Sequence, residues 1–130
     1  MTYVDGFVIP VQKSKVAAYR KMAREGADLW MKHGALDYKE CIADDLTSFG
    51  ADGKPAPSIF PKLARAKRNE VVFFSYIVYR SKAHRTRVNK KVMSDPKMLG
   101  MDATKMPFDV KRMAHAGFMA VVEAPTRRRR

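Results

Sequence analysis

The 130-residue sequence contains only one cysteine, Cys41, so no disulfide can form within the chain. We therefore expect a reducing, cytoplasmic setting, with Cys41 serving as a small core residue. No apolar run approaches the length needed to cross a membrane. The first ten residues include Asp5 and lack the basic start and long apolar stretch of a secretory signal. These absences exclude membrane spans and extracellular disulfide scaffolds from our expectations.

Short metal and nucleotide motifs are also missing. The three histidines, His33, His84 and His115, fall in three separate segments, and neither HExxH nor paired-cysteine spacing occurs. No GxGxxG sequence or P-loop is present. We expect no metal and no cofactor.

Acidic residues are scarce in one part of a chain whose formal charge is +13. Residues 62–91 carry ten bases and one acid, and the chain ends in four arginines. Such a segment attracts anions, including nucleic acid. The alternative is a solvated helix face followed by a basic, disordered tail over residues 124–130.

What is present suits one globular domain, because 46% of the residues are hydrophobic and 30% are charged. Alternating or continuous apolar patterns predict four strands, and amphipathic patterns predict two helices. Ser14 and Gly34 are expected to cap the first helix, and Ser81 the second. Residues 46–61 read as a long loop. The predicted elements are strands near residues 3–11, 35–45, 70–79 and 114–124, and helices near 14–33 and 81–95.

The order βαββαβ predicts an α+β, ferredoxin-like fold, an antiparallel sheet with both helices on one face. The strands near residues 3–11, 70–79 and 114–124 are apolar on both faces, although two helices cover only one. We therefore expect a second copy of the chain to cover the other face, giving a homodimer. Residues 1–123 would form this single domain.

Several stretches carry a resemblance to a known family: YVDGFVIPV, HGALDYKECIADD, EVVFFSYIVYRSKAHRTRVNKKVM, DPKM and MPFDVKRMAHAGF. Together they resemble the uncharacterised bacterial YbaA-like family of the dimeric α/β-barrel superfamily, over about residues 2–123. The resemblance implies a ferredoxin-like protomer that pairs into a barrel-forming homodimer. It implies no established activity, and the chain differs from the family pattern at Arg80, HRTR and AHAGF.

Asp109 and Arg112 are an acid and a base three residues apart in an apolar setting. Asp109 can cap a turn through backbone amides or pair with Arg112. We expect Arg112 to be at least half buried and bonded to an acid or to carbonyl groups. The functional alternative is that Arg112 binds an anionic ligand group, with Asp109 orienting it.

Four further polar residues are candidates for a pocket. His33 lies on the apolar arc of the first helix. It can act as a general base, or it can be a structural histidine that interacts with the last carbonyl groups of the helix. Glu40 shares a strand face with Tyr38 and must be paired or protonated if buried. Ser75 and Asn89 can hydrogen-bond a ligand or the backbone. The candidate pocket is thus His33, Glu40, Ser75, Asn89, Asp109 and Arg112.

Three functions from different classes remain open at this stage, the last of them an interaction protein whose only partner is a second copy of itself. The first is binding or conversion of a small molecule in the cleft between sheet and helices, which is a usual ligand site. Whether such a protein is an enzyme or a binder stays open, and no catalytic residue is assigned. The second is nucleic-acid or polyanion binding through residues 62–91 and the arginine tail.

Overall fold

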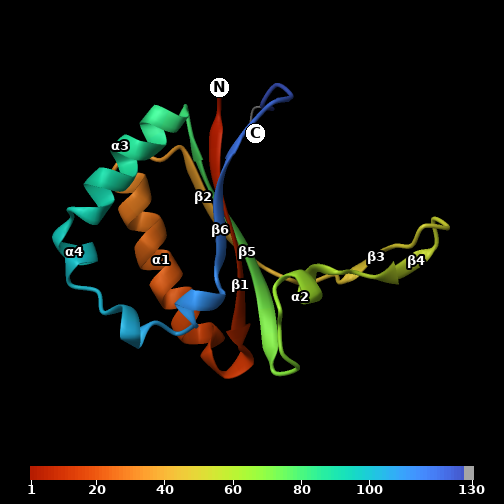
Figure 1. Ribbon diagram of the computed structural model, residues 1–130. Coiled ribbons are helices and arrows are strands. Elements are labelled where there is room, and N and C mark those ends of the chain that lie inside the picture. Colours follow the sequence, from red (N-terminus) through yellow and green to blue (C-terminus); the bar gives the residue numbers. More distant parts are fainter. Residues whose placement is uncertain (128–130) are drawn as a thin grey trace.

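The computed structural model describes residues 1–127, and the last three arginines of the predicted tail lie outside the described residues. Its main feature is a four-stranded antiparallel sheet in the order β2-β5-β1-β6. The helices α1 and α3 lie on one side of this sheet (Figure 1). The strands are β1 (Tyr3–Gln12), β2 (Asp37–Ile42), β5 (Glu70–Tyr79) and β6 (Ala114–Met119), and the helices are α1 (Val16–Lys32) and α3 (Lys82–Met93). The predicted ferredoxin-like βαββαβ pattern is confirmed.

The two ends of α1 differ in how well the sequence predicts them. Ser14 falls inside a 3-10 turn, η1 (Lys13–Lys15), and the helix starts after Lys15 without a side-chain cap, so the Ser14 cap was wrong. Ser14 lies in this turn and not at the helix start, because η1 follows β1 directly in the chain. At the other end, Gly34 has φ +108°, the left-handed conformation expected after a helix C-terminus.

The helix α3 begins as predicted, because the Ser81 hydroxyl accepts a hydrogen bond from the His84 amide. Its buried positions are His84, Val88 and Val92, spaced at one helical turn. Val88 and Val92 pack in one core cluster with Tyr79 and Leu29. The second cluster holds Ile9, Val11, Tyr19, Ala23 and Phe73.

The long loop expected over residues 46–61 contains regular structure instead. The strands β3 (Thr47–Phe49) and β4 (Pro55–Pro57) pair as a hairpin, followed by the short helix α2 (Phe60–Leu63). The hairpin projects away from the sheet on the side opposite α1 and α3 (Figure 1). The sequence does not reveal this hairpin, because its strands contain prolines and lack the alternation of apolar and polar residues that marks a half-buried strand. Every residue of the two strands except Ala56 is exposed in the structure.

The connection from α3 to β6 contains one short α-helix and two 3-10 turns. These are α4 (Pro96–Leu99), η2 (Ala103–Lys105) and η3 (Val110–Arg112). Within residues 1–127 no helix combines the length and apolarity needed to cross a membrane.

The two faces of the sheet differ in what covers them. The strand register places Glu40, Ser75, Phe7 and His115 in one row across the face that carries the helices. On the other face, which we call the open face, Phe74 is 44% exposed and Phe118 is 57% exposed. Cys41 pairs with Phe74 on this open face and is exposed, so its assignment to the core was wrong. The alternation along β2 explains this, because Glu40 faces the helices and its neighbour must face away.

Candidate functional site

A cleft of about 580 Å³ lies between α1 and the edge of the sheet formed by β2. Its walls are largely apolar and include Val16, Ala23, Ala27, Ile42 and Phe73. Clefts with apolar walls and a few converging polar groups are usual ligand sites. Glu40 supplies the converging carboxylate here.

Both oxygens of Glu40 are held by phenol groups. The Tyr19 hydroxyl donates to Oε1 at 2.7 Å, and the Tyr38 hydroxyl donates to Oε2 at 2.9 Å. Tyr19 comes from α1, and Tyr38 comes from β2 two residues before Glu40 on the same face. The carboxylate is therefore fixed in position by donors from both walls.

The two tyrosines stay protonated across the physiological pH range. Burial, and next the negative charge of Glu40, raise the pKa of Tyr19 and of Tyr38 well above the ordinary phenol value. Each phenol therefore remains a donor to the carboxylate. The lone pairs of Glu40 that these bonds leave free can accept from a ligand N–H or O–H group.

Charged residues of α1 line the same cleft. Arg20, Arg24 and Asp28 are exposed and follow one another at helical spacing along it. The cleft thus combines apolar walls, one fixed carboxylate and a charged rim. This arrangement suits a small molecule with an apolar body, a donor for Glu40 and a charged or polar end near the rim.

Ser75 lies directly across from Glu40 in the register of β2 and β5. Its side chain is buried on the helix-covered face, with the residue only 2% exposed. Of the six residues predicted for the pocket, Glu40 and Ser75 are the pair that the sheet brings side by side.

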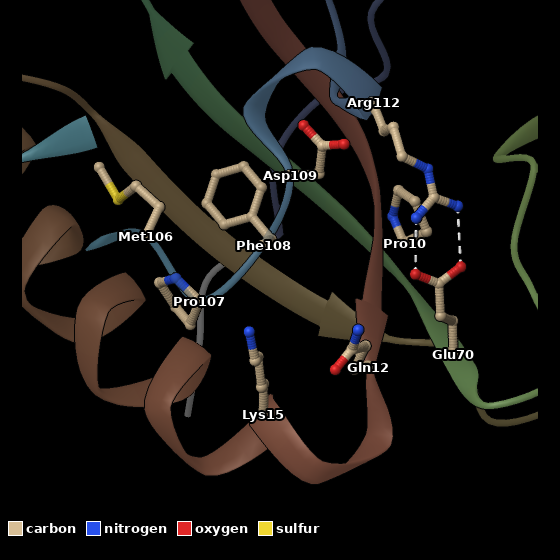
Figure 2. A pocket seen from close by; sticks show the side chains of 9 residues that line it. All are labelled: Pro10, Gln12, Lys15, Glu70, Met106, Pro107, Phe108, Asp109 and Arg112. Atoms are coloured by element: carbon tan, nitrogen blue, oxygen red, sulfur yellow. Dashed lines mark hydrogen bonds and ion pairs between the residues drawn. The ribbon is translucent and has the colours of Figure 1, made fainter. Parts of the chain in front are cut away.

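Arg112 lies elsewhere, beside the start of β5, and its side chain is 24% exposed. Its Nη1 and Nη2 donate to the two carboxylate oxygens of Glu70 at 2.6 and 2.8 Å, as Figure 2 shows. Nη2 also donates to the Arg65 carbonyl at 2.7 Å, where the backbone has φ +55°. The prediction that Arg112 is at least half buried and bonded to an acid or to carbonyl groups is confirmed.

The acid that pairs with Arg112 is Glu70, and Asp109 has the other expected use. Its carboxylate accepts from the Lys111 amide at 3.0 Å and caps the turn η3. The hydrogen bonds from Arg112 lower the pKa of Glu70 from 4.5 to about 2. The hollow beside this pair, about 250 Å³, is lined by Lys15, Phe108 and Asp109 among others (Figure 2).

His33 lies at the end of α1 and contacts Asp95 through Nε2 at 2.7 Å. Asp95 also accepts from Lys32 Nζ at 3.1 Å and from the Lys97 amide, which starts α4. The hydrogen bond from His33 is the main reason that the pKa of Asp95 lies well below its usual value. His33 thus joins α1 to α4 and does not reach the cleft residues that surround Glu40.

Asn89 bridges the two helices and the sheet. Its Oδ1 accepts from Trp30 Nε1 at 3.1 Å and from the Tyr79 hydroxyl at 3.3 Å. The six predicted residues therefore occupy four places: Glu40 with Ser75, Arg112 near Asp109, His33, and Asn89.

Sequence reasoning did not assign Tyr19 to the site, although Tyr19 lies on the apolar arc of α1. A tyrosine hydroxyl on such an arc needs a partner when buried, and a buried acid on a neighbouring strand is a natural one. Among residues 1–127, no three histidine, cysteine, aspartate or glutamate side chains gather in a way that would hold a metal ion.

The sheet order and the two helices on one face define a ferredoxin-like α+β domain. The chain belongs to the family described as "Protein of unknown function (DUF1428)", whose model matches residues 2–110. It is 44% identical over 123 residues to the uncharacterized protein YbaA of Escherichia coli (strain K12), covering 95% of this chain and 99% of that protein. The same values hold for YbaA of Shigella flexneri. The predicted YbaA-like family is confirmed.

Solved structures with the same fold are far more distant in sequence. Rv0793 from Mycobacterium tuberculosis has a TM-score of 0.53 at 14% identity, covering 96% of this chain and all of that one (100%). A putative antibiotic biosynthesis monooxygenase from Nitrosomonas europaea has a TM-score of 0.53 at 12% identity, covering 92% of this chain and 90% of that one. An uncharacterized NIPSNAP domain protein from Burkholderia xenovorans has a TM-score of 0.52 at 14% identity, covering 95% and 99%. At these identities the likeness concerns the fold alone.

Proposed function

We propose that the protein binds a small molecule in the cleft between α1 and β2, with Glu40 as the group that recognises it. The observation that carries the proposal is the carboxylate held at 2.7 and 2.9 Å by two phenols inside a cleft of about 580 Å³. A partly buried carboxylate with both oxygens fixed is a preorganised acceptor. The ligand has an apolar body and an N–H or O–H group that donates to Glu40.

Native mass spectrometry of protein purified directly from its host tests the proposal. We expect a co-purified small molecule, retained by Ala18→Trp and lost in Ala27→Trp. Ala27 lines the cleft, whereas Ala18 is an exposed position on the same helix. A molecule retained equally by both folded variants, or none in the wild type, contradicts the proposal.

A charge-matched pair examines the role of Glu40 itself. Glu40→Gln removes the negative charge from the cleft, and Glu25→Gln removes one from the exposed side of α1. We expect at least a tenfold loss of affinity for the co-purified molecule in the first variant and no change in the second, since a hydrogen bond to a charged group contributes about 1.5–3 kcal/mol. Incubating that molecule with a trace of protein then separates an enzyme, which consumes it, from a binder, which returns it unchanged.

The proposed unit is a homodimer in which a second copy covers the open face. This is supported by the exposed Phe74 and Phe118 and by the neighbouring Val4, Val8 and Val78 on that face. An obligate interface of this kind buries on the order of 2,000 Å². We expect a dimer at micromolar concentration in sedimentation equilibrium, and a monomer for Phe118→Glu. A wild-type monomer contradicts this part of the proposal.

Nucleic-acid binding through residues 62–91 remains the alternative. The basic residues of this segment lie partly near α2 and partly on α3, at opposite ends of the ten-residue strand β5. Ten strand residues span about 33 Å, and this separation of the two ends of β5 argues against one continuous patch of charge. A steep, log-linear salt dependence of binding to a random DNA duplex is the result that would favour the alternative. The single cysteine supports our proposal of a cytoplasmic location.

A further inference from the structure

A second carboxylate, more deeply buried than Glu40, lies on the same face of the sheet at the side away from Glu40. Asp5 on β1 is 2% exposed, and its Oδ1 accepts no hydrogen bond within the described residues. A buried carboxylate oxygen without a donor is costly, so nearly all such atoms in proteins have a partner. An occupant that donates to this oxygen would remove the cost.

The side chains of Arg85 and His115 approach the same oxygen, but neither donates a hydrogen bond to it. Arg85 Nη1 lies 3.5 Å from Asp5 Oδ1, and His115 Nε2 lies 3.9 Å from it. Charge-assisted hydrogen bonds are shorter, about 2.7–2.9 Å. The buried Nε of Arg85 has no hydrogen-bond partner either. Asp5 Oδ1, an acceptor, and Arg85 Nε, a donor, therefore both lack a hydrogen-bond partner, although they belong to one ion pair.

The surroundings of these atoms are aromatic. The Arg85 guanidinium lies over the Tyr3 ring at 5.0 Å, and His115 stacks on Phe7 at 4.5 Å. Every residue of β6 is exposed, and the side chain of His115 is 40% exposed. Asp5 itself is closed off from solvent, and the exposed edge strand β6, which carries His115, is the nearest part of its surroundings that solvent reaches.

Gly117 pairs with Asp5 across β1 and β6. A Cβ at this position would collide with the Tyr3 hydroxyl, so the Tyr3 ring lies directly over the glycine. The absence of a side chain lets Tyr3 reach the place where it supports Arg85.

We propose that Asp5, Arg85 and His115 form a second ligand site, which takes the hydroxyl group of a small phenol or aryl alcohol. A hydroxyl group donates to Asp5 Oδ1 and accepts from Arg85 Nε at the same time. The aryl ring contacts the Tyr3 and His115 side chains at the β6 edge. The site is separate from the cleft, because Glu40 and His115 are three strand spacings apart, about 15 Å.

The test is an NMR titration of the full chain with phenol, and with toluene as the control that replaces the hydroxyl by a methyl group. The ring signals of His115 report this site, and the indole signal of Trp30, which lies 6.3 Å from the Tyr38 ring, reports the neighbourhood of the cleft. We expect phenol to shift the His115 signals in a saturable manner, with affinity at least tenfold higher than that of toluene.

Variants then assign the effect to the unpartnered atoms. Asp5→Asn removes the charge of the acceptor, and Arg85→Lys keeps the positive charge but removes the Nε–H donor. We expect each to weaken phenol binding at His115 at least fivefold, while Glu25→Gln leaves it unchanged. If a variant does not fold, the comparison of phenol with toluene on the wild type decides alone.

Three outcomes overturn the proposal. The first is equal binding of phenol and toluene. The second is phenol binding that survives in folded Asp5→Asn and Arg85→Lys. The third is no saturable change at His115, which would leave a water-bridged structural ion pair at this place.

Discussion

Glu40 and Asp5 are two carboxylates on the same face of one sheet, and they differ in how their oxygens are satisfied. Each oxygen of Glu40 accepts a short hydrogen bond from a phenol. Asp5 Oδ1 accepts none, although Arg85 and His115 approach it to 3.5 and 3.9 Å. Glu40 lies on the edge strand β2, and Asp5 lies on the inner strand β1.

The difference follows from where the partners originate. Tyr38 is two residues from Glu40 on the same strand, so one of the two bonds is fixed by local geometry. The side chains that approach Asp5 Oδ1 come from α3 and β6, and both depend on the packing of distant elements. A carboxylate with its bonds complete is a fixed anchor, whereas one with an unused oxygen is a place where an occupant adds stability.

The largest expected effect comes from removing the Glu40 carboxylate, whose two oxygens both accept hydrogen bonds. In Glu40→Leu the hydroxyls of Tyr19 and Tyr38 lose their acceptor while remaining in the partly buried cleft wall. We expect the free energy of unfolding to fall by about 2–3 kcal/mol, measured by urea denaturation.

Glu40→Gln is the matched control for that measurement, because its amide still offers one oxygen and one N–H group to the two phenols. We expect it to cost about 1 kcal/mol. Equal losses for the leucine and glutamine variants would mean that the charge, not the number of hydrogen bonds, stabilises this region.

Glu70 is a third carboxylate to compare with Glu40 and Asp5. Its two oxygens accept hydrogen bonds from the Arg112 cation and not from phenols. Arg112 lowers its pKa from 4.5 to about 2, so the folded state binds the proton less well than the unfolded state. The pair therefore stabilises the fold fully above about pH 4.5, and this stability is lost as the pH falls toward 2.

We expect Glu70→Gln to lower Tm by several degrees at pH 6 and by much less at pH 3. Thermal unfolding of both proteins at several pH values measures the difference. Glu25→Gln, at an exposed position of α1, is expected to follow the wild type throughout. A Tm difference that does not depend on pH would show that the pair acts through packing and not through its charges.

Local features of this chain were predictable from the sequence, and long-range partners were not. The strand over Glu70–Tyr79, the Ser81 cap and the Gly34 conformation follow from patterns of a few residues. The sequence predicted that Arg112 would bond to an acid, but it did not identify Glu70, which is 42 residues away. No local spacing identifies that partner, because it depends on how β5 and η3 meet.

The same limit explains the site. The alternation along β2 placed Glu40 on the helix side, but Tyr19 became its partner only when α1 packed across the sheet. Asp5 stands between Tyr3 and Phe7 on a buried face, and that pattern marks a buried acid in the sequence. Its neighbours Arg85 and His115 are 80 and 110 positions along the chain, and only the fold brings them together.

The smallest expected effect is that of Asp5→Asn on the ligand-free protein, and it is the direct counterpart of the Glu40 variants. The substitution keeps the shape of the side chain and an oxygen near Arg85. Because Oδ1 accepts no hydrogen bond in the structure, no such bond is lost when the charge is removed. The ion pair at 3.5 Å is loosened, but burial of the carboxylate charge is relieved as well, and these two effects oppose each other. We therefore expect a change in the free energy of unfolding below about 1 kcal/mol in urea denaturation.

With a saturating occupant the two proteins should diverge, because the wild type alone gains the full binding energy at this site. A loss of several kcal/mol without any added ligand would show that the Asp5 carboxylate is already satisfied, as Glu40 is, and would remove the contrast between the two regions.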